Sequence, residues 1–185
     1  MPRTGPLLPH EPRIANPDAE RALTERFLVP ALDDLEALFR WLRADVKPAL
    51  ARARPVKMGK AFPMGQCLEI SRAVEARLRT VEAARLDGAP ARGLIALVAF
   101  MSHGGTMRKV WGDLRGEYFQ NAFIVGSLYV DVANDTVVPT KPAIEILPFD
   151  RSCLVAIEDF RHYAAVAQRY WGARLHPNHA LPALA

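Results

Sequence analysis

The pattern of apolar residues changes between the two halves of this chain, and the change limits the folds that the chain can form. Up to about residue 86, apolar side chains recur every three or four positions, the spacing that puts them on one face of an α-helix. Between residues 117 and 133, two apolar runs meet at Gly126-Ser127, a pair that suits a tight β-hairpin turn. Helices followed by an antiparallel sheet and a closing helix predict an α+β fold.

The individual elements follow from the same patterns. Asn16-Pro17 is typical of a helix start, and Pro30 opens a second helix that Pro48 is expected to kink or end. Asp87-Gly88 is expected to end the third helix. In chain order, we expect helices over 17–28, from 30 onward and over 66–86, strands over 94–100, 117–125, 128–133 and 144–149, and a last helix over 158–171.

The length of 185 residues suits one well-buried domain. We expect a flexible, proline-rich arm over residues 1–16, a single domain over 17–172 and a short tail over 173–185. The longest apolar run, 94–101, is too short to span a bilayer, and the first residues lack the apolar stretch of a signal peptide. Two cysteines, Cys67 and Cys153, do not suggest a disulfide framework, so a reducing cytoplasm is the expected compartment.

The net charge of +4 is modest, and the densest basic run precedes Cys67. It consists of Arg52, Arg54, Lys57 and Lys60. This run is either a solvated helix end and loop or a patch that steers an anionic partner toward the cysteine. No nucleic-acid motif accompanies it, and we expect no nucleic-acid partner. No metal or nucleotide signature is present, and we expect no cofactor.

Cys67 lies where a predicted loop becomes a predicted helix. It ends the segment Phe62-Pro63-Met64-Gly65-Gln66-Cys67 and falls in the first turn of the helix. Unpaired backbone N–H groups and the positive end of the helix dipole favour a thiolate at such a position. The backbone N–H groups around Gln66 and Cys67 could also stabilise an oxyanion. The sequence therefore predicts a nucleophile site at this helix start.

The predicted hairpin supplies the residues that would face this cysteine. Its first strand contains Gln120 and Asn121, and its second strand ends at Asp131. A thiol facing a polar residue on one strand and an acid on the next is the arrangement of a nucleophile triad. The middle member should be histidine, and asparagine cannot carry a proton between atoms. His103, on a glycine turn after the predicted strand 94–100, is the candidate for a substitute, although a turn histidine is commonly just solvated.

These motifs resemble those of bacterial transglutaminase-like proteins, which are related to papain-like cysteine hydrolases. The Pro63-x-Gly65-x-Cys67 segment matches their cysteine motif, and their His-Ala-aromatic strand corresponds here to Asn121-Ala122-Phe123. In that family an aspartate follows on the next strand, as Asp131 does in Tyr129-Val130-Asp131. The resemblance implies a helix that bears Cys67 and packs on a twisted antiparallel sheet. It also implies Cys67 as nucleophile, Asp131 as orienter and Asn121 in the place of the histidine, with Gln66, Gln120 and His103 as auxiliary residues.

Two functional hypotheses remain open. The first is a non-standard or inactive member of this family, a pseudoenzyme that binds a peptide, a protein or a small amide ligand in its cleft. The alternative is an active cysteine amidase, peptidase or acyltransferase with Cys67 as nucleophile. Asn121 favours the first hypothesis, whereas Cys67 and Asp131 favour the second. The sequence does not indicate an oligomeric state.

Overall fold

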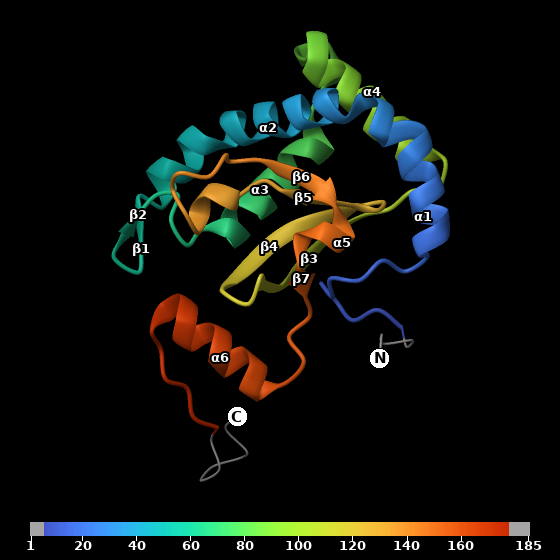
Figure 1. Ribbon diagram of the computed structural model, residues 1–185. Helices are drawn as coiled ribbons and strands as arrows, with labels where there is room; N and C mark the ends of the chain where they lie inside the picture. The colour runs from blue at the N-terminus through green and yellow to red at the C-terminus, as the bar shows by residue number, and fades with distance from the viewer. Residues whose placement is uncertain (1–5, 178–185) are drawn as a thin grey trace.

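A computed structural model describes residues 6–177 (Figure 1). Its helices are α1 (Pro17–Leu23), α2 (Leu32–Ala53), α3 (Cys67–Thr80), α4 (Gly88–Ser102), α5 (Phe149–Ser152) and α6 (Phe160–Trp171). Its strands are β1 (Val56–Lys57), β2 (Lys60–Ala61), β3 (Met107–Leu114), β4 (Tyr118–Val125), β5 (Leu128–Asp131), β6 (Glu145–Pro148) and β7 (Leu154–Val155). The predicted α+β class is confirmed. No helix among the described residues is long and apolar enough to cross a membrane.

The main sheet has the strand order β6-β5-β4-β3-β7, with antiparallel neighbours throughout. Trp111 pairs with Asn121, and Phe123 pairs with Val130. Because side chains alternate between the two faces of a strand, Asn121 and Phe123 lie on one face of β4, while Gln120 and Ala122 lie on the other. This alternation decides which polar residues can meet Cys67.

The main core lies between the helices and one face of the sheet. The apolar stripe of α2, which includes Leu35, Phe39 and Leu42, is fully buried against α3 and against Phe123 of β4. The backbones of α2 and α4 come close together at Gly93, where a Cβ atom would lie 2.2 Å from the carbonyl oxygen of Asp34. In Figure 1, α2 runs over the sheet and α3 lies between them. This packing fixes the start of α3 beside β4.

A second core covers the reverse face of the sheet. It contains Val110, Leu114, Ala122, Ile124, Tyr129 and Leu154, and Ile14 packs against it. The backbone N–H of Trp111 donates to the carbonyl oxygen of His10 at 2.9 Å. The later part of the predicted arm therefore contacts β3, while residues 1–5 of the arm and 178–185 of the tail lie outside the described residues.

Two of the expected elements are wrong. Residues 94–100, predicted as a strand, lie inside α4, because a short apolar run has the same appearance in a buried strand and in a helix with few polar residues. The helix predicted to end near residue 86 ends at Thr80, and Gly88 begins α4 instead of stopping a helix. Of the two alternatives for Pro48, a kink or an end of the helix, the end is excluded, because Pro48 lies inside α2, which continues to Ala53.

Other elements agree with the sequence patterns. The hairpin of β4 and β5 turns at Gly126-Ser127, and β6 pairs with β5 as an edge strand. The last predicted helix is α6. The strands β3 and β7 were not predicted, and the loop expected over 54–65 contains the short β1–β2 hairpin.

Candidate functional site

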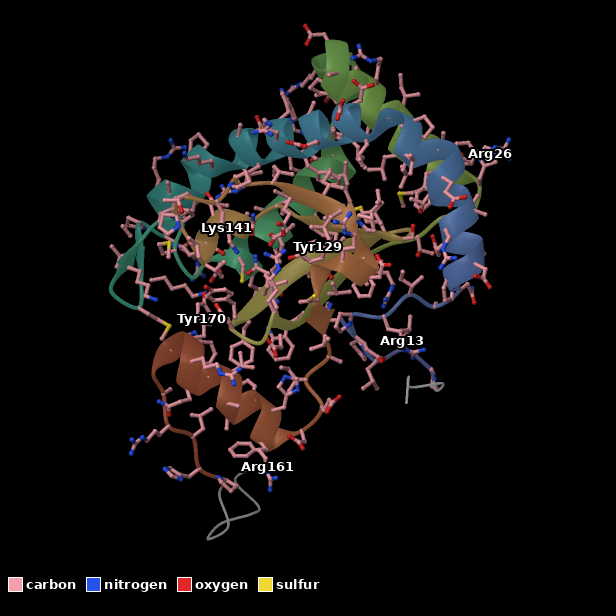
Figure 2. The ribbon with its side chains drawn as sticks, viewed as in Figure 1. Arg13, Arg26, Tyr129, Lys141, Arg161 and Tyr170 are labelled. Atoms are coloured by element: carbon pink, nitrogen blue, oxygen red, sulfur yellow. The ribbon has the colours of Figure 1, made fainter. Side chains whose placement is uncertain are left out.

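A cleft of about 310 Å³ opens at the start of α3. Four parts of the chain enclose it: the β1–β2 hairpin, the first turn of α3, the paired strands β3 and β4, and the last turn of α6. Its walls consist of Lys57, Met58, Lys60, Gly65, Cys67, Leu68, Trp111, Phe119, Asn121, Tyr170 and Trp171. Figure 2 shows Tyr170 between α6 and the sheet. The cleft therefore combines a cysteine, an amide, two lysines and several aromatic rings.

The backbone geometry of the preceding loop places Cys67 at the start of α3. Gly65 adopts φ +69°, a conformation that glycine tolerates without strain, and its N–H donates to the carbonyl oxygen of Thr136 at 3.0 Å. Gln66 follows, and its Nε2 donates to the carbonyl oxygen of Arg54 at 2.9 Å. These bonds tie both ends of the loop to the body of the protein. Cys67 is then the first residue of α3.

The thiol of Cys67 faces β4 and is only 8% exposed. The Nδ2 of Asn121 donates to its Sγ at 3.4 Å, and the carbonyl oxygen of Phe119 lies 4.0 Å from the sulfur. Burial raises the pKa of the Cys67 thiol above its usual 9.0, and the hydrogen bond from Asn121 offsets only part of this effect. The surroundings therefore favour the neutral thiol near neutral pH.

Asn121 occupies the position that a proton acceptor would need. It is as buried as Cys67, and its amide can donate to sulfur but cannot take up a proton. Among the described residues that line the cleft there is no histidine, aspartate or glutamate. The contact between Cys67 and Asn121 thus holds a thiol in place without a base beside it.

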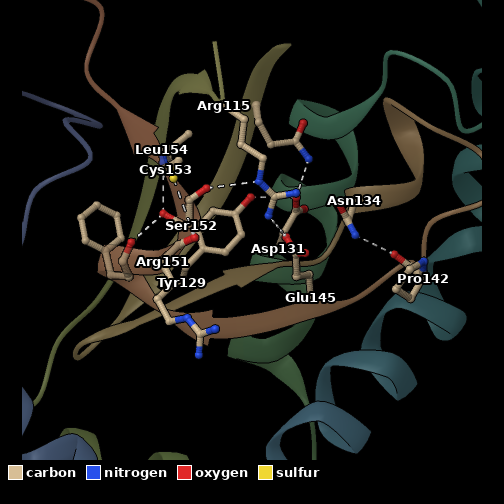
Figure 3. A network of polar contacts seen from close by, with 12 residues as sticks. Arg115, Tyr129, Asp131, Asn134, Pro142, Glu145, Arg151, Ser152, Cys153 and Leu154 are labelled. Carbon is tan, nitrogen blue, oxygen red and sulfur yellow. Dashed lines mark hydrogen bonds and ion pairs between the residues drawn. The ribbon is translucent and has the colours of Figure 1, made fainter. Parts of the chain in front are cut away.

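Asp131 belongs to a separate network on the reverse face of the sheet (Figure 3). Its Oδ2 accepts hydrogen bonds from Gln120 Nε2 at 2.7 Å and from the Tyr129 hydroxyl at 2.9 Å. Its Oδ1 accepts from the backbone N–H of Ala133 at 2.7 Å. Burial raises the pKa of Asp131 to about 6, against these bonds, which favour the carboxylate. Neither Asp131 nor Gln120 lines the cleft.

Strand register explains why Asp131 does not meet Asn121. Because Phe123 pairs with Val130, the next pair along the ladder sets Asp131 opposite Ala122. Paired residues share a face, and Ala122 points away from Asn121. The spacing along the sequence places Asn121 and Asp131 on adjacent strands. It does not set the strand register, and a shift of one residue in register moves a side chain to the opposite face of the sheet. The structure therefore brings Cys67 and Asn121 together and leaves Asp131 with Gln120 and Tyr129.

His103 and His162 both have contacts outside the cleft wall. His103 caps the end of α4, where its Nδ1 lies 2.8 Å from the carbonyl oxygen of Ala99 and its ring packs on Phe27 at 4.5 Å. His162, on α6, has its Nε2 2.9 Å from Asp113 Oδ2 on β3. Because its Nδ1 accepts the N–H of Glu158, the proton belongs on Nε2, which donates to Asp113. His162 therefore fastens α6 to the sheet.

Several cleft residues carried no functional prediction or only an ambiguous one. Lys57 and Lys60 belong to the basic run, and the β1–β2 hairpin turns both toward the cleft. Trp111, Tyr170 and Trp171, for which no function was predicted, line it as well. The basic run and the aromatic residues of the last helix are visible in the sequence, but only long-range packing shows that they meet at Cys67.

The described residues contain no group of three or more histidine, cysteine, aspartate or glutamate side chains that could hold a metal ion. Comparisons with protein-family models, with curated proteins and with solved structures found no match for this chain. The contacts within the cleft are therefore the basis for inferring its chemistry.

Proposed function

We propose that the cleft beside Cys67 binds a peptide or a small amide ligand without cleaving it, as a non-standard member of the transglutaminase-like class. The observation that carries this proposal is the 3.4 Å contact between Asn121 Nδ2 and Cys67 Sγ, with an amide where catalysis needs a base. Attack on an amide carbonyl requires a thiolate, and the departing amine requires a proton. Asn121 can neither take the proton from the thiol nor deliver one to the amine, and burial raises the pKa of the thiol.

The cleft offers the groups that an extended peptide needs for binding. Its aromatic walls can cover apolar side chains, and the Asn121 amide can bond to a peptide group. The helix start at Cys67 adds N–H groups of the first turn of α3, because the preceding residue, Gln66, makes no capping bond with its described side chain. These features support recognition of a peptide backbone, whichever side chains it presents.

The alternative is an active cysteine amidase, peptidase or acyltransferase. The position of Cys67 at the first residue of α3, on the wall of an open cleft, favours it. In that mechanism Cys67 would lose its proton to the substrate's own amine or to water, since the described cleft wall contains no side-chain base. This requirement makes the alternative the weaker of the two.

The two cysteines allow a test inside one molecule. Cys67 is buried and Cys153 is exposed, so iodoacetamide should label Cys153 quickly and Cys67 slowly. N-acetyl dipeptide amides should bind in calorimetry, slow the labelling of Cys67 further, and leave the labelling of Cys153 unchanged. Release of ammonia or amine from these peptides, abolished by Cys67→Ser and retained by Cys153→Ser, would contradict silent binding and establish the enzyme.

A further inference from the structure

The charged side chains of the cleft wall are lysines. Lys57 and Lys60 both line it, and none of the described wall residues is an aspartate or glutamate. The carboxylate of Glu69 accepts two hydrogen bonds from Lys57 Nζ, at 2.9 and 3.0 Å, and lies 3.8 Å from Arg54. Three cations, Arg54, Lys57 and Lys60, thus outnumber the single carboxylate Glu69, and the net charge at the opening of the cleft is positive.

The two lysines differ in how they are engaged. Lys57 is held by Glu69, so moving it toward a ligand would break an ion pair. Lys60 is exposed, and its Nζ lies over the ring of Tyr170, 5.8 Å from the ring centre. Lys60 loses little when it turns from the ring to an anion, because a cation–π contact at an exposed site is weak. Lys60 is therefore the cation that a ligand can use.

Flat apolar surface lies next to this cation. Trp171 is 43% exposed, and its ring packs on Phe119 at 4.8 Å and on the neighbouring Tyr170 at 5.8 Å. Trp111 also lines the cleft and stacks on Phe119 at 5.5 Å. Aromatic side chains already fixed by their neighbours can cover a ligand ring at little entropic cost.

We propose that the ligand of this cleft presents a carboxylate beside an aromatic ring, as a peptide ending in an aromatic residue does. The carboxylate meets Lys60, and the ring lies against Trp171. The peptide group before the last residue then reaches toward Asn121. This inference rests on the proposed function, because it specifies the ligand of the same cleft.

A matched pair of probes isolates the charge. N-acetyl-glycyl-tryptophan and its C-terminal amide have the same ring and peptide group but differ in the anion. Calorimetric titration of the wild-type protein should give roughly tenfold tighter binding for the acid, the usual effect of one charge-assisted hydrogen bond. Lys60→Gln should weaken the binding of the acid about tenfold and so remove this preference, and Lys60→Arg should retain it.

Lys141→Gln is the matched control. Lys141 also lies over a tyrosine ring, that of Tyr118 at 5.6 Å, but it is not part of the cleft wall. The variant should keep the preference for the acid. N-acetyl-aspartyl-tryptophan amide tests whether a side-chain carboxylate serves as well as a terminal one, and binding equal to that of the acid would support the same recognition from either source.

The failures of the two proposals are distinguishable. Equal binding of acid and amide to the wild-type protein would overturn recognition of the anion but leave peptide binding in place. An absence of binding for both peptides would overturn peptide binding and this inference together. Binding of inorganic phosphate that depends on Lys60, without binding of either peptide, would show that the cation serves phosphate ligands and would also overturn the inference.

Discussion

Replacing Asp131 by asparagine tests whether its carboxyl group has a structural or a catalytic role. Asp131 is fully buried, and its pKa is raised to about 6 from the ordinary 3.8. Between these pH values the folded protein keeps a proton that the unfolded chain has released, so the free energy of unfolding falls as the pH rises through this window. A pKa shift of this size corresponds to about 3 kcal/mol between pH 3.8 and 6, as an order of magnitude.

Asparagine removes this dependence because it does not titrate. Its oxygen can take the place of Oδ1 and accept from the backbone N–H of Ala133. Its nitrogen then takes the place of Oδ2 and can donate to the Tyr129 hydroxyl oxygen and, once the Gln120 amide turns over, to Gln120 Oε1, which is buried and has no partner in the described structure. The protonated aspartic acid and asparagine have similar shape and bonding capacity, so Asp131→Asn should change stability little near pH 4. Above pH 6 the variant should be more stable than the wild type, by up to about 3 kcal/mol.

Urea unfolding followed by circular dichroism at several pH values from about 4 to 8 measures this difference. Asp18→Asn, at an exposed position in the first turn of α1, is the control and should show a small difference at every pH. A difference for Asp131→Asn that does not change with pH would refute the reasoning. The negative charge of Asp131 contributes to the raised pKa of Cys67, so Asp131→Asn should slightly speed alkylation of Cys67 above pH 6, whereas slower alkylation would mean that Asp131 activates the thiol.

The other predictions concern the cleft and its helix. Asn121→His should speed alkylation of Cys67 near neutral pH. The amide of Asn121 lies 3.4 Å from the sulfur, so an imidazole at this position should reach the thiolate, pair with it and lower the pKa of Cys67. In the wild type, alkylation of Cys67 should rise only at alkaline pH, since burial raises its pKa, while Cys153 should be alkylated faster because it is exposed. His162→Ala should lower the free energy of unfolding by about 1–3 kcal/mol, because it leaves the buried Asp113 carboxylate without this partner.

A specific result would contradict each of these predictions. An unchanged alkylation rate in Asn121→His, in a protein that remains folded, would mean that an imidazole at this position does not reach the thiol. Labelling of Cys67 as fast as that of Cys153 at pH 7 would mean an open and activated thiol. An unchanged urea midpoint in His162→Ala would mean that the bond to Asp113 does not fasten α6 to the sheet.

Local patterns in the sequence were enough to define much of the fold. The turn at Gly126-Ser127 and the stripe of α2 depend on residues only a few positions apart, and both agree with the structure. The start of α3 at Cys67 likewise follows from the glycine turn at Gly65 and the apolar spacing after it. In contrast, the apolar run 94–100 fits either a strand or a helix, and its burial against α2 at Gly93 decides in favour of the helix.

The composition of the site depends on contacts between distant parts of the chain. By itself, the sequence determined that a cysteine begins a helix and that a hairpin with Asn121 and Asp131 follows. Strand register, fixed by the pairing of β4 with β5, decided that Asn121 faces the thiol and that Asp131 faces away. The packing of α6 on β4 brought Trp171 to the same cleft. Register and helix docking are set by the burial of whole surfaces, and a one-residue shift that spacing along the chain does not reveal exchanges the faces of a strand.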